Sequence, residues 1–124
     1  MEKRKESVLK NKSYKFAVRI VRLSQYLEQE KKEFVLNKQI LRSGTAIGAI
    51  IREAEFAQSP SDYIHKFSVA LKEANETDYW LALLNDTEFV ENKLFESLSK
   101  DCKELVSMLV STIKTLKDKL KTKN

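Results

Sequence analysis

Residues 39–53 read Gln-Ile-Leu-Arg-Ser-Gly-Thr-Ala-Ile-Gly-Ala-Ile-Ile-Arg-Glu, and their apolar positions recur at the period of an α-helix. The apolar stripe continues on both sides of this stretch and consists of Leu36, Ile40, Ile47, Ile51 and Ala54. Such a stripe buries one face of a helix and leaves the opposite face to polar residues. The pattern predicts a helix from about Phe34 or Val35 to Gln58.

Both glycines of the chain, Gly44 and Gly48, lie four residues apart inside this stretch. A glycine inside a helix costs up to ~1 kcal/mol relative to alanine, because it loses more backbone entropy on folding. We therefore expect a neighbouring backbone to approach the helix closely at these positions. A loop at residues 43–45, which would split the helix in two, is the alternative interpretation of the same glycines.

Three other segments carry apolar residues at the same three- and four-residue spacing. The clearest boundary is Ser59-Pro60-Ser61-Asp62, which places serine at an N-cap, proline at the first helical position and an acid at the third. The expected helices are residues 13–32, 34–58, 60–85 and 91–120. Amphipathic helices with short links favour antiparallel neighbours. The sequence therefore predicts an all-α, antiparallel up-down-up-down four-helix bundle.

Length and composition support this prediction. The chain has 124 residues, enough for one domain, and its two glycines and one proline allow only a few turns between long elements. We expect a basic N-terminal tail at residues 1–12, a bundle at 13–120 and a basic C-terminal tail at 121–124. A single cysteine, with no apolar stretch long enough for a signal peptide or a membrane span, favours a cytoplasmic protein.

Residues that carry chemistry are scarce in this chain. His65 is the only histidine, both glycines lie in an expected helix, and no Cys-x-x-Cys or Glu-x-x-His motif occurs. Cys102 falls in the apolar stripe of the last helix, where it is expected to be a small buried residue. We expect no catalytic residue, no cofactor and no metal site, and therefore a protein that is not an enzyme.

A polar network is expected between the second and third helices. If the turn is centred near residue 59, positions whose numbers sum to about 118 lie at the same level of an antiparallel pair. Arg42 then faces Glu76, with Glu73 nearby, and its planar guanidinium can bond two carboxylate oxygens. Glu53 lies on the same stripe as Arg42. We interpret this set as an ion network that fixes helix register, because such pairs add specificity more reliably than stability.

Tyr79 and Trp80 are adjacent on the third expected helix, so their side chains point about 100° apart. Leu81 and Leu84 already occupy the core stripe, which leaves Trp80 and Leu83 at its flank. Because exposed large apolar groups mark protein–protein surfaces, Tyr79, Trp80 and Leu83 form a candidate oligomer interface. The alternative is that the last helix or the N-terminal tail covers Trp80.

The net charge of +5 is concentrated at the two ends of the chain. Residues 1–12 carry +3 and residues 114–124 carry +4, whereas the segment between them carries −2. In an up-down-up-down bundle both chain ends lie at the same end of the molecule, so these charges add. Clustered lysines bind nucleic-acid phosphates without reading sequence, although solubilising lysines at frayed ends would look the same. The candidate nucleic-acid contacts are Lys3, Arg4, Lys5, Lys117, Lys119, Lys121 and Lys123.

Two motifs on the second and third expected helices carry a family resemblance. They are Gln39-x-x-Arg42-Ser43-x-x-x-Ile47 with Ile51-x-Glu53, and Asp62-Tyr63 with Ala70-Leu71-x-x-Ala74-x-Glu76. These motifs resemble the four-helix bundle proteins of the 23S rRNA intervening-sequence family over nearly the whole chain. The resemblance implies a left-handed bundle that forms ring-like homopentamers. Related bundles accompany the reverse transcriptases of diversity-generating retroelements and bind nucleic acid, which implies RNA or a nucleic-acid enzyme as a partner.

The sequence therefore leads to two functional expectations. The first is a homo-oligomeric binding module that is not an enzyme and that takes RNA or other nucleic acid at its clustered basic ends. The second is a structural scaffold that binds another protein and has no role with nucleic acid.

Overall fold

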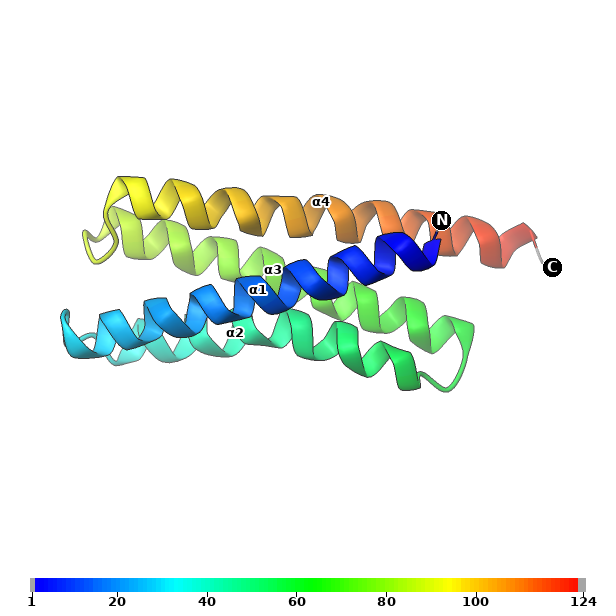
Figure 1. Ribbon diagram of the computed structural model, residues 1–124, viewed down its shortest axis with the longest axis horizontal. Helices are drawn as coiled ribbons and strands as arrows, with labels where there is room; N and C mark the ends of the chain where they lie inside the picture. Colours follow the sequence, from blue (N-terminus) through cyan, green and yellow to red (C-terminus); the bar gives the residue numbers. More distant parts are fainter. Residues whose placement is uncertain (1, 123–124) are drawn as a thin grey trace.

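The computed structural model describes residues 2–122, and it describes side chains from Arg4 to Thr122. This part of the chain forms four α-helices, one short 3₁₀ turn and no strand (Figure 1). The elements are α1 (Glu2–Gln29), α2 (Val35–Glu53), the 3₁₀ turn η1 (Ala54–Phe56), α3 (Pro60–Asp86) and α4 (Asn92–Thr122). The predicted all-α class is confirmed.

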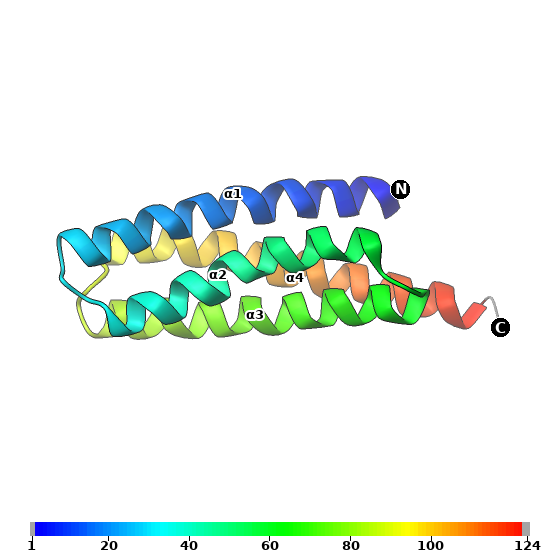
Figure 2. The same ribbon diagram turned by 90° about the horizontal axis from the view of Figure 1, so that it is seen from below.

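Neighbouring helices run in opposite directions. Along the seam between α1 and α4, Lys5 Nζ lies 3.2 Å from Ser111 Oγ, whereas Arg19 Nη1, further along α1, lies 2.7 Å from Asp101 Oδ2, nearer the start of α4. Figures 1 and 2 show the same alternation around the bundle. In the described residues α1 and α3 each pack on both α2 and α4, and the backbones of the diagonal pairs stay further apart. This is the predicted up-down-up-down arrangement; its left-handed sense stays a prediction.

The first helix begins at Glu2, so the prediction of a separate N-terminal tail at residues 1–12 is wrong. Leu9 is completely buried although charged residues surround it in the sequence. It lies seven residues before Phe16, so it continues the apolar stripe of α1 by two further turns. At the other end of the chain, α4 extends to Thr122 and includes the first two residues of the expected C-terminal tail.

The second helix is continuous from Val35 to Glu53, so the alternative of a loop at 43–45 is wrong. A Cβ atom at Gly44 would lie 2.8 Å from Cγ1 and from Cγ2 of Ile20 on α1. A Cβ atom at Gly48 would lie 3.3 Å from the backbone of Ser13. The predicted approach of a neighbouring backbone is confirmed at Gly48, whereas at Gly44 it is the side chain of Ile20 that takes the space a Cβ atom would need.

The start of α3 follows the predicted capping pattern. Ser59 has extended backbone angles, and its hydroxyl oxygen accepts a hydrogen bond from the backbone N–H of Asp62 at 3.0 Å. The Asp62 carboxylate in turn accepts from the backbone N–H of Gln58 at 3.1 Å. The first bond satisfies an N–H group that the helix itself leaves without a partner, and the second ties the residue before the cap to the first turn. The chain before this cap differs from expectation, because α2 ends at Glu53 and η1 follows.

The core contains apolar side chains from all four helices, and paired polar groups are buried beside them. Ser24 Oγ donates to Asn37 Oδ1 between α1 and α2, and Thr77 Oγ1 lies 2.9 Å from Ser43 Oγ between α2 and α3. In the described part of the chain no buried side-chain nitrogen or oxygen atom lacks a partner. Burying such groups is costly unless they are paired, so these contacts favour one helix register.

No helix in residues 2–122 combines the length and the apolar character that crossing a membrane requires. The hydrophobic surface of α1 to α4 is instead used to pack the four helices against one another.

The close approach at Gly44 predicts that Gly44→Ala will destabilise the fold by about 1–2 kcal/mol. Overpacking typically costs ~1–3 kcal/mol, and the gain of ~1 kcal/mol in helix propensity offsets only part of it. Ile20 is β-branched and stiff in a helix, so it cannot easily turn away. Urea unfolding followed by circular dichroism measures the effect.

The same substitution in an Ile20→Ala background should cost much less, because both γ carbons that the new methyl group meets are then gone. Ala49→Gly, at an exposed position of the same helix, should show no such dependence on residue 20. Equal costs of Gly44→Ala in both backgrounds would contradict the close approach.

Candidate functional site

An ion cluster links α2 to α3 on the surface of the bundle. Arg42 Nη1 lies 3.1 Å from Glu73 Oε1, and Arg42 Nη2 pairs with Glu76. Trp80 Nε1 donates a hydrogen bond of 3.1 Å to Glu76 Oε2. Glu73, Glu76 and Trp80 follow one another at steps of three and four, so they lie along one side of α3. The structure thus brings together the three charged residues that the antiparallel register placed at one level.

The environment of this cluster is that of a surface ion pair. The Arg42 side chain is 51% exposed, and pairs of this exposure contribute ~0.2–1 kcal/mol. The pKa of Glu76 is lowered from its ordinary value of 4.5, most strongly by the hydrogen bond from Trp80. Burial opposes this as the second-largest effect, and the hydrogen bond and charge of Arg42 lower the pKa further. These properties fit a contact that fixes register, and they provide no unpaired group for catalysis. Glu53, at the other end of α2, is exposed and lies outside this cluster.

The candidate oligomer interface lies beside the ion cluster. Tyr79 is 60% exposed, whereas Trp80 and Leu83 are partly buried. The Tyr79 and Trp80 rings meet edge to face with centroids 5.0 Å apart. Val35, which sequence reasoning missed, is 72% exposed at the start of α2, and the antiparallel register places it level with Leu83. The antiparallel register could have identified Val35, because it brings the start of α2 to the end of α3.

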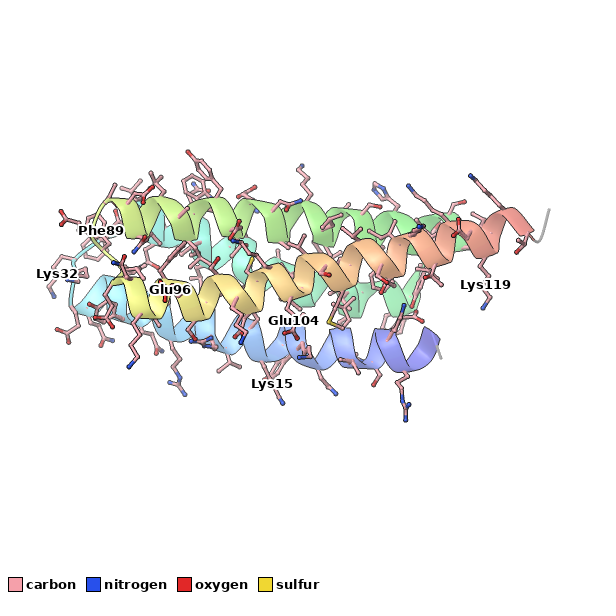
Figure 3. All side chains as sticks on the ribbon, turned by 90° about the horizontal axis from the view of Figure 1, so that it is seen from above. Lys15, Lys32, Phe89, Glu96, Glu104 and Lys119 are labelled. Atoms are coloured by element: carbon pink, nitrogen blue, oxygen red, sulfur yellow. The ribbon has the colours of Figure 1, made fainter. Side chains whose placement is uncertain are left out.

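Both chain ends lie at one end of the bundle, as expected, and the connection between α2 and α3 lies there too (Figures 1 and 2). We call this the basic end. Figure 3 shows Lys119 on the part of α4 that extends past the start of α1. The candidate side chains Arg4, Lys5, Lys117, Lys119 and Lys121 are exposed. Those of Lys3 and Lys123 lie outside the described side chains.

The contribution of the N-terminal segment is smaller than its charge suggests. Lys10 pairs with Glu55 of η1, and Lys12 pairs with Glu104 of α4. Lys5 Nζ is within hydrogen-bonding distance of Ser111. Because Lys10 and Lys12 are paired with acids, most of the net positive charge at this end lies on the last turns of α4. There, four lysines accompany only one acid, Asp118, among the described residues.

The lysines of α4 also have a structural role. Cations near the end of a helix interact favourably with the partial negative charge of its unpaired carbonyl groups. Each such interaction contributes ~0.3–1 kcal/mol, and Lys119 and Lys121 lie in the last turn of α4. The lysines are therefore compatible with helix stabilisation alone, and their functional significance depends on what else lies at the basic end.

Sequence reasoning missed an aromatic residue at the basic end. Phe56, in η1, is 82% exposed, and Tyr63 lies one helical turn into α3. Neither is near the C-terminal lysines in the sequence, so a scan for aromatic residues among those lysines could not find them. The topology could have located these two aromatic residues, because the α2–α3 connection lies at the same end of the bundle as both chain termini.

Other reactive groups are either buried or dispersed. In the described residues no three His, Cys, Asp or Glu side chains are close enough together to hold a metal ion. Cys102 is buried, as predicted, and its Sγ lies 3.3 Å from the carbonyl oxygen of Ala74. Burial raises the pKa of its thiol to about 12, with a smaller effect from the nearby Asp78. Cys102 is therefore a packing residue, because only the thiolate is a good nucleophile.

These features define a class: an antiparallel four-helix bundle whose described surface has an interhelical ion cluster and a basic end. The 23S rRNA-intervening sequence protein family matches residues 5–111, so the chain belongs to that family. A crystal structure at 1.70 Å from Bacteroides thetaiotaomicron, of a protein of unknown function from the S23 ribosomal protein family, is similar. It is 57% identical with a TM-score of 0.87, and the match covers 89% of this chain and 98% of that one. No curated protein matches significantly.

The hydrogen bond from Trp80 predicts a change in the titration of Glu76. Trp80→Phe keeps an aromatic ring but removes the donor, so the pKa of Glu76 should rise towards 4.5. Ionised Glu76 stabilises the fold above its unfolded pKa, and this contribution is lost as the pH falls through the lower folded pKa. The variant should lose part of this acid-sensitive stability. Carbon-13 NMR of the side-chain carboxyl group measures the pKa directly.

Tyr79→Phe, on the same helix, is the control for this titration and should leave Glu76 unchanged. If Trp80→Phe also left the pKa of Glu76 unchanged, the hydrogen bond would not be its main cause.

Proposed function

We propose that this protein is a homo-oligomer without enzymatic activity that binds RNA through its basic end. The observation that carries the proposal is the run of exposed lysines on the last turns of α4, at the end of the bundle where α1 begins. Such a cluster attracts a polyanion, because each phosphate it neutralises releases condensed counterions into solution. The contacts need no base-specific geometry, which suits flexible lysines on a helix end.

The shape of the basic end supports this proposal. The end of α4 extends beyond the start of α1, so its final turns stand away from that helix (Figure 3). Lys117 and Lys121 lie four residues apart and are exposed, which places two positive charges on one side of α4. A phosphate chain could therefore approach these lysines without displacing another helix.

Oligomerisation is part of the proposal because one basic end is a weak site. A few lysines bind RNA loosely at physiological salt, whereas several linked sites act at a high effective concentration. Tyr79, Trp80 and Leu83 provide an apolar surface for subunit contact, with Val35 extending it on α2. We propose a pentamer, as the family resemblance implies, with its basic ends on one side of the ring.

A structural scaffold without any role for nucleic acid is the second candidate. The exposed aromatic surface around Tyr79 favours it, because a different protein could occupy the same surface. The ultraviolet absorbance ratio of the protein purified at low salt separates the two candidates. Retained nucleic acid supports the first, and its absence at low salt favours the scaffold.

The proposal predicts weaker RNA binding when the lysines of α4 are neutralised. Replacing Lys117, Lys119, Lys121 and Lys123 by Gln should weaken binding and flatten its salt dependence. The slope of log K against log[salt] should fall by up to about 3, because each neutralised phosphate on a single strand contributes ~0.7. Fluorescence anisotropy with labelled RNA at several salt concentrations measures both effects.

A matched control removes the same number of positive charges elsewhere. Replacing the exposed residues Lys32, Lys38, Lys93 and Lys100 by Gln should change binding and its salt slope much less. Figure 3 shows Lys32 at the opposite end of the bundle from Lys119. If the two sets of substitutions had equal effects, binding would reflect overall charge and not the basic end.

The oligomer is tested by light scattering. The wild-type protein should have a mass about five times the 14.4 kDa of one chain. Tyr79→Glu should give the mass of a single chain, because it places a charge in the proposed apolar contact. Tyr79→Phe, which keeps the ring, should leave the mass unchanged. A wild-type monomer would refute the oligomer, and an oligomeric Tyr79→Glu variant would place its interface elsewhere.

A further inference from the structure

The basic end contains an apolar pocket of about 350 Å³. Its volume lies near the lower end of the ~300–1,000 Å³ range of small-molecule sites. The segment after α2, the start of α3 and the end of α4 all contribute apolar walls, from Ala54, Pro60, Ile64, Leu116 and Leu120. Lys119 also lines the pocket. A ligand here would meet an apolar space bordered by Lys119 of α4 and by Glu55, which pairs with Lys10 of α1.

An aromatic side chain forms a rigid wall of this pocket. Tyr63 lines it, and the Tyr63 ring meets Phe67 edge to face at a centroid distance of 4.9 Å. The Tyr63 hydroxyl donates a hydrogen bond to the Glu6 carboxylate of α1. Because the Tyr63 ring is already held at both ends, a ligand that packs against it binds without the entropic cost of immobilising this side chain.

A second aromatic side chain stands beside the pocket. Phe56 is 82% exposed, the largest exposed fraction among the large hydrophobic side chains described. Its neighbours in the chain, Glu55 and Ala57, both line the pocket. A single exposed apolar residue is common on protein surfaces and needs no explanation by itself. Here the exposed ring lies between two residues that line an apolar pocket, and Lys119 of α4 lines the same pocket.

We infer that the basic end binds unpaired nucleotides, with one base in the pocket against Tyr63 and a neighbouring base stacked on Phe56. Lys117, Lys119 and Lys121 then contact the flanking phosphates. Aromatic side chains and positive charge are the two components of single-strand sites, since every base has a face that can stack. Bases inside an RNA duplex are stacked on one another and do not present these faces. This inference rests on the proposed function and names its substrate class.

Binding of unpaired RNA and of duplex RNA should distinguish this site from a surface that attracts phosphates by charge alone. A duplex carries about twice the phosphate charge of one strand per unit length, so a purely charged surface should bind it at least as tightly. A site built for bases should prefer the unpaired strand. The probes are a labelled unpaired RNA of about 12 nucleotides, within the range of single-strand site sizes, and a duplex of the same length.

Phe56→Ala should weaken binding of the unpaired RNA by roughly 5- to 150-fold, the range measured for the loss of one stacked base. Binding of the duplex should not change. Phe56→Trp should retain the preference for unpaired RNA, because the larger ring still stacks. The matched control is Phe34→Ala, which removes a phenylalanine that is 49% exposed before the start of α2.

The outcomes separate this inference from the proposed function. If both RNAs bind in a salt-dependent manner but Phe56→Ala has no effect on the unpaired one, the inference is overturned and the proposed function stands. If neither RNA binds, both are overturned. If Phe56→Ala lowers the mass of the oligomer, Phe56 is a subunit contact and the inference is overturned. If decanoate displaces bound RNA and Phe56→Ala has no effect on RNA binding, the pocket is a site for acyl chains, and the inference is again overturned.

Discussion

The contact between α1 and α2 at the two glycines fixes the geometry on which the other features depend. With no side chain at Gly44, Ile20 lies 2.8 Å from where a Cβ atom would otherwise be, and at Gly48 the backbone of Ser13 lies 3.3 Å from the corresponding point. Two such positions one turn apart leave α1 little freedom to slide along α2, because packed side chains and backbone tolerate little overlap. The buried pair of Ser24 and Asn37 supports the same register from within the interface.

Once α1 is placed on α2, the directions of the other helices follow from their short connections. Each helix must reverse the direction of the one before, so α1 begins where α4 ends and where α2 passes into α3. Three separate parts of the sequence thus meet at the basic end: the first turns of α1, the segment around Phe56 and the last turns of α4. The chemistry of this end is a property of the topology, because no single segment contains it.

The features that the sequence predicted are those with a local or periodic origin. Helix positions follow from apolar spacing, the start of α3 from its serine and proline, and the pairing of Arg42 with Glu76 from one assumed turn. The features it missed depend on distance in the chain. Leu9 extends α1 to Glu2, but charged neighbours hide it from a local scan. Phe56 and the exposed side chain of Val35 gain significance only when another helix is placed beside them.

The two polar regions of the surface contribute to the protein in different ways. The Arg42 cluster is internally paired and half exposed, so it adds little to the free energy of unfolding and chiefly distinguishes one helix register from others. The lysines of α4 stabilise their own helix end, and with one acid among them they give its last turns a net positive charge. A net positive charge beside a preformed apolar pocket lowers the cost of binding an anion that carries an apolar group, because neither component has to be assembled on binding.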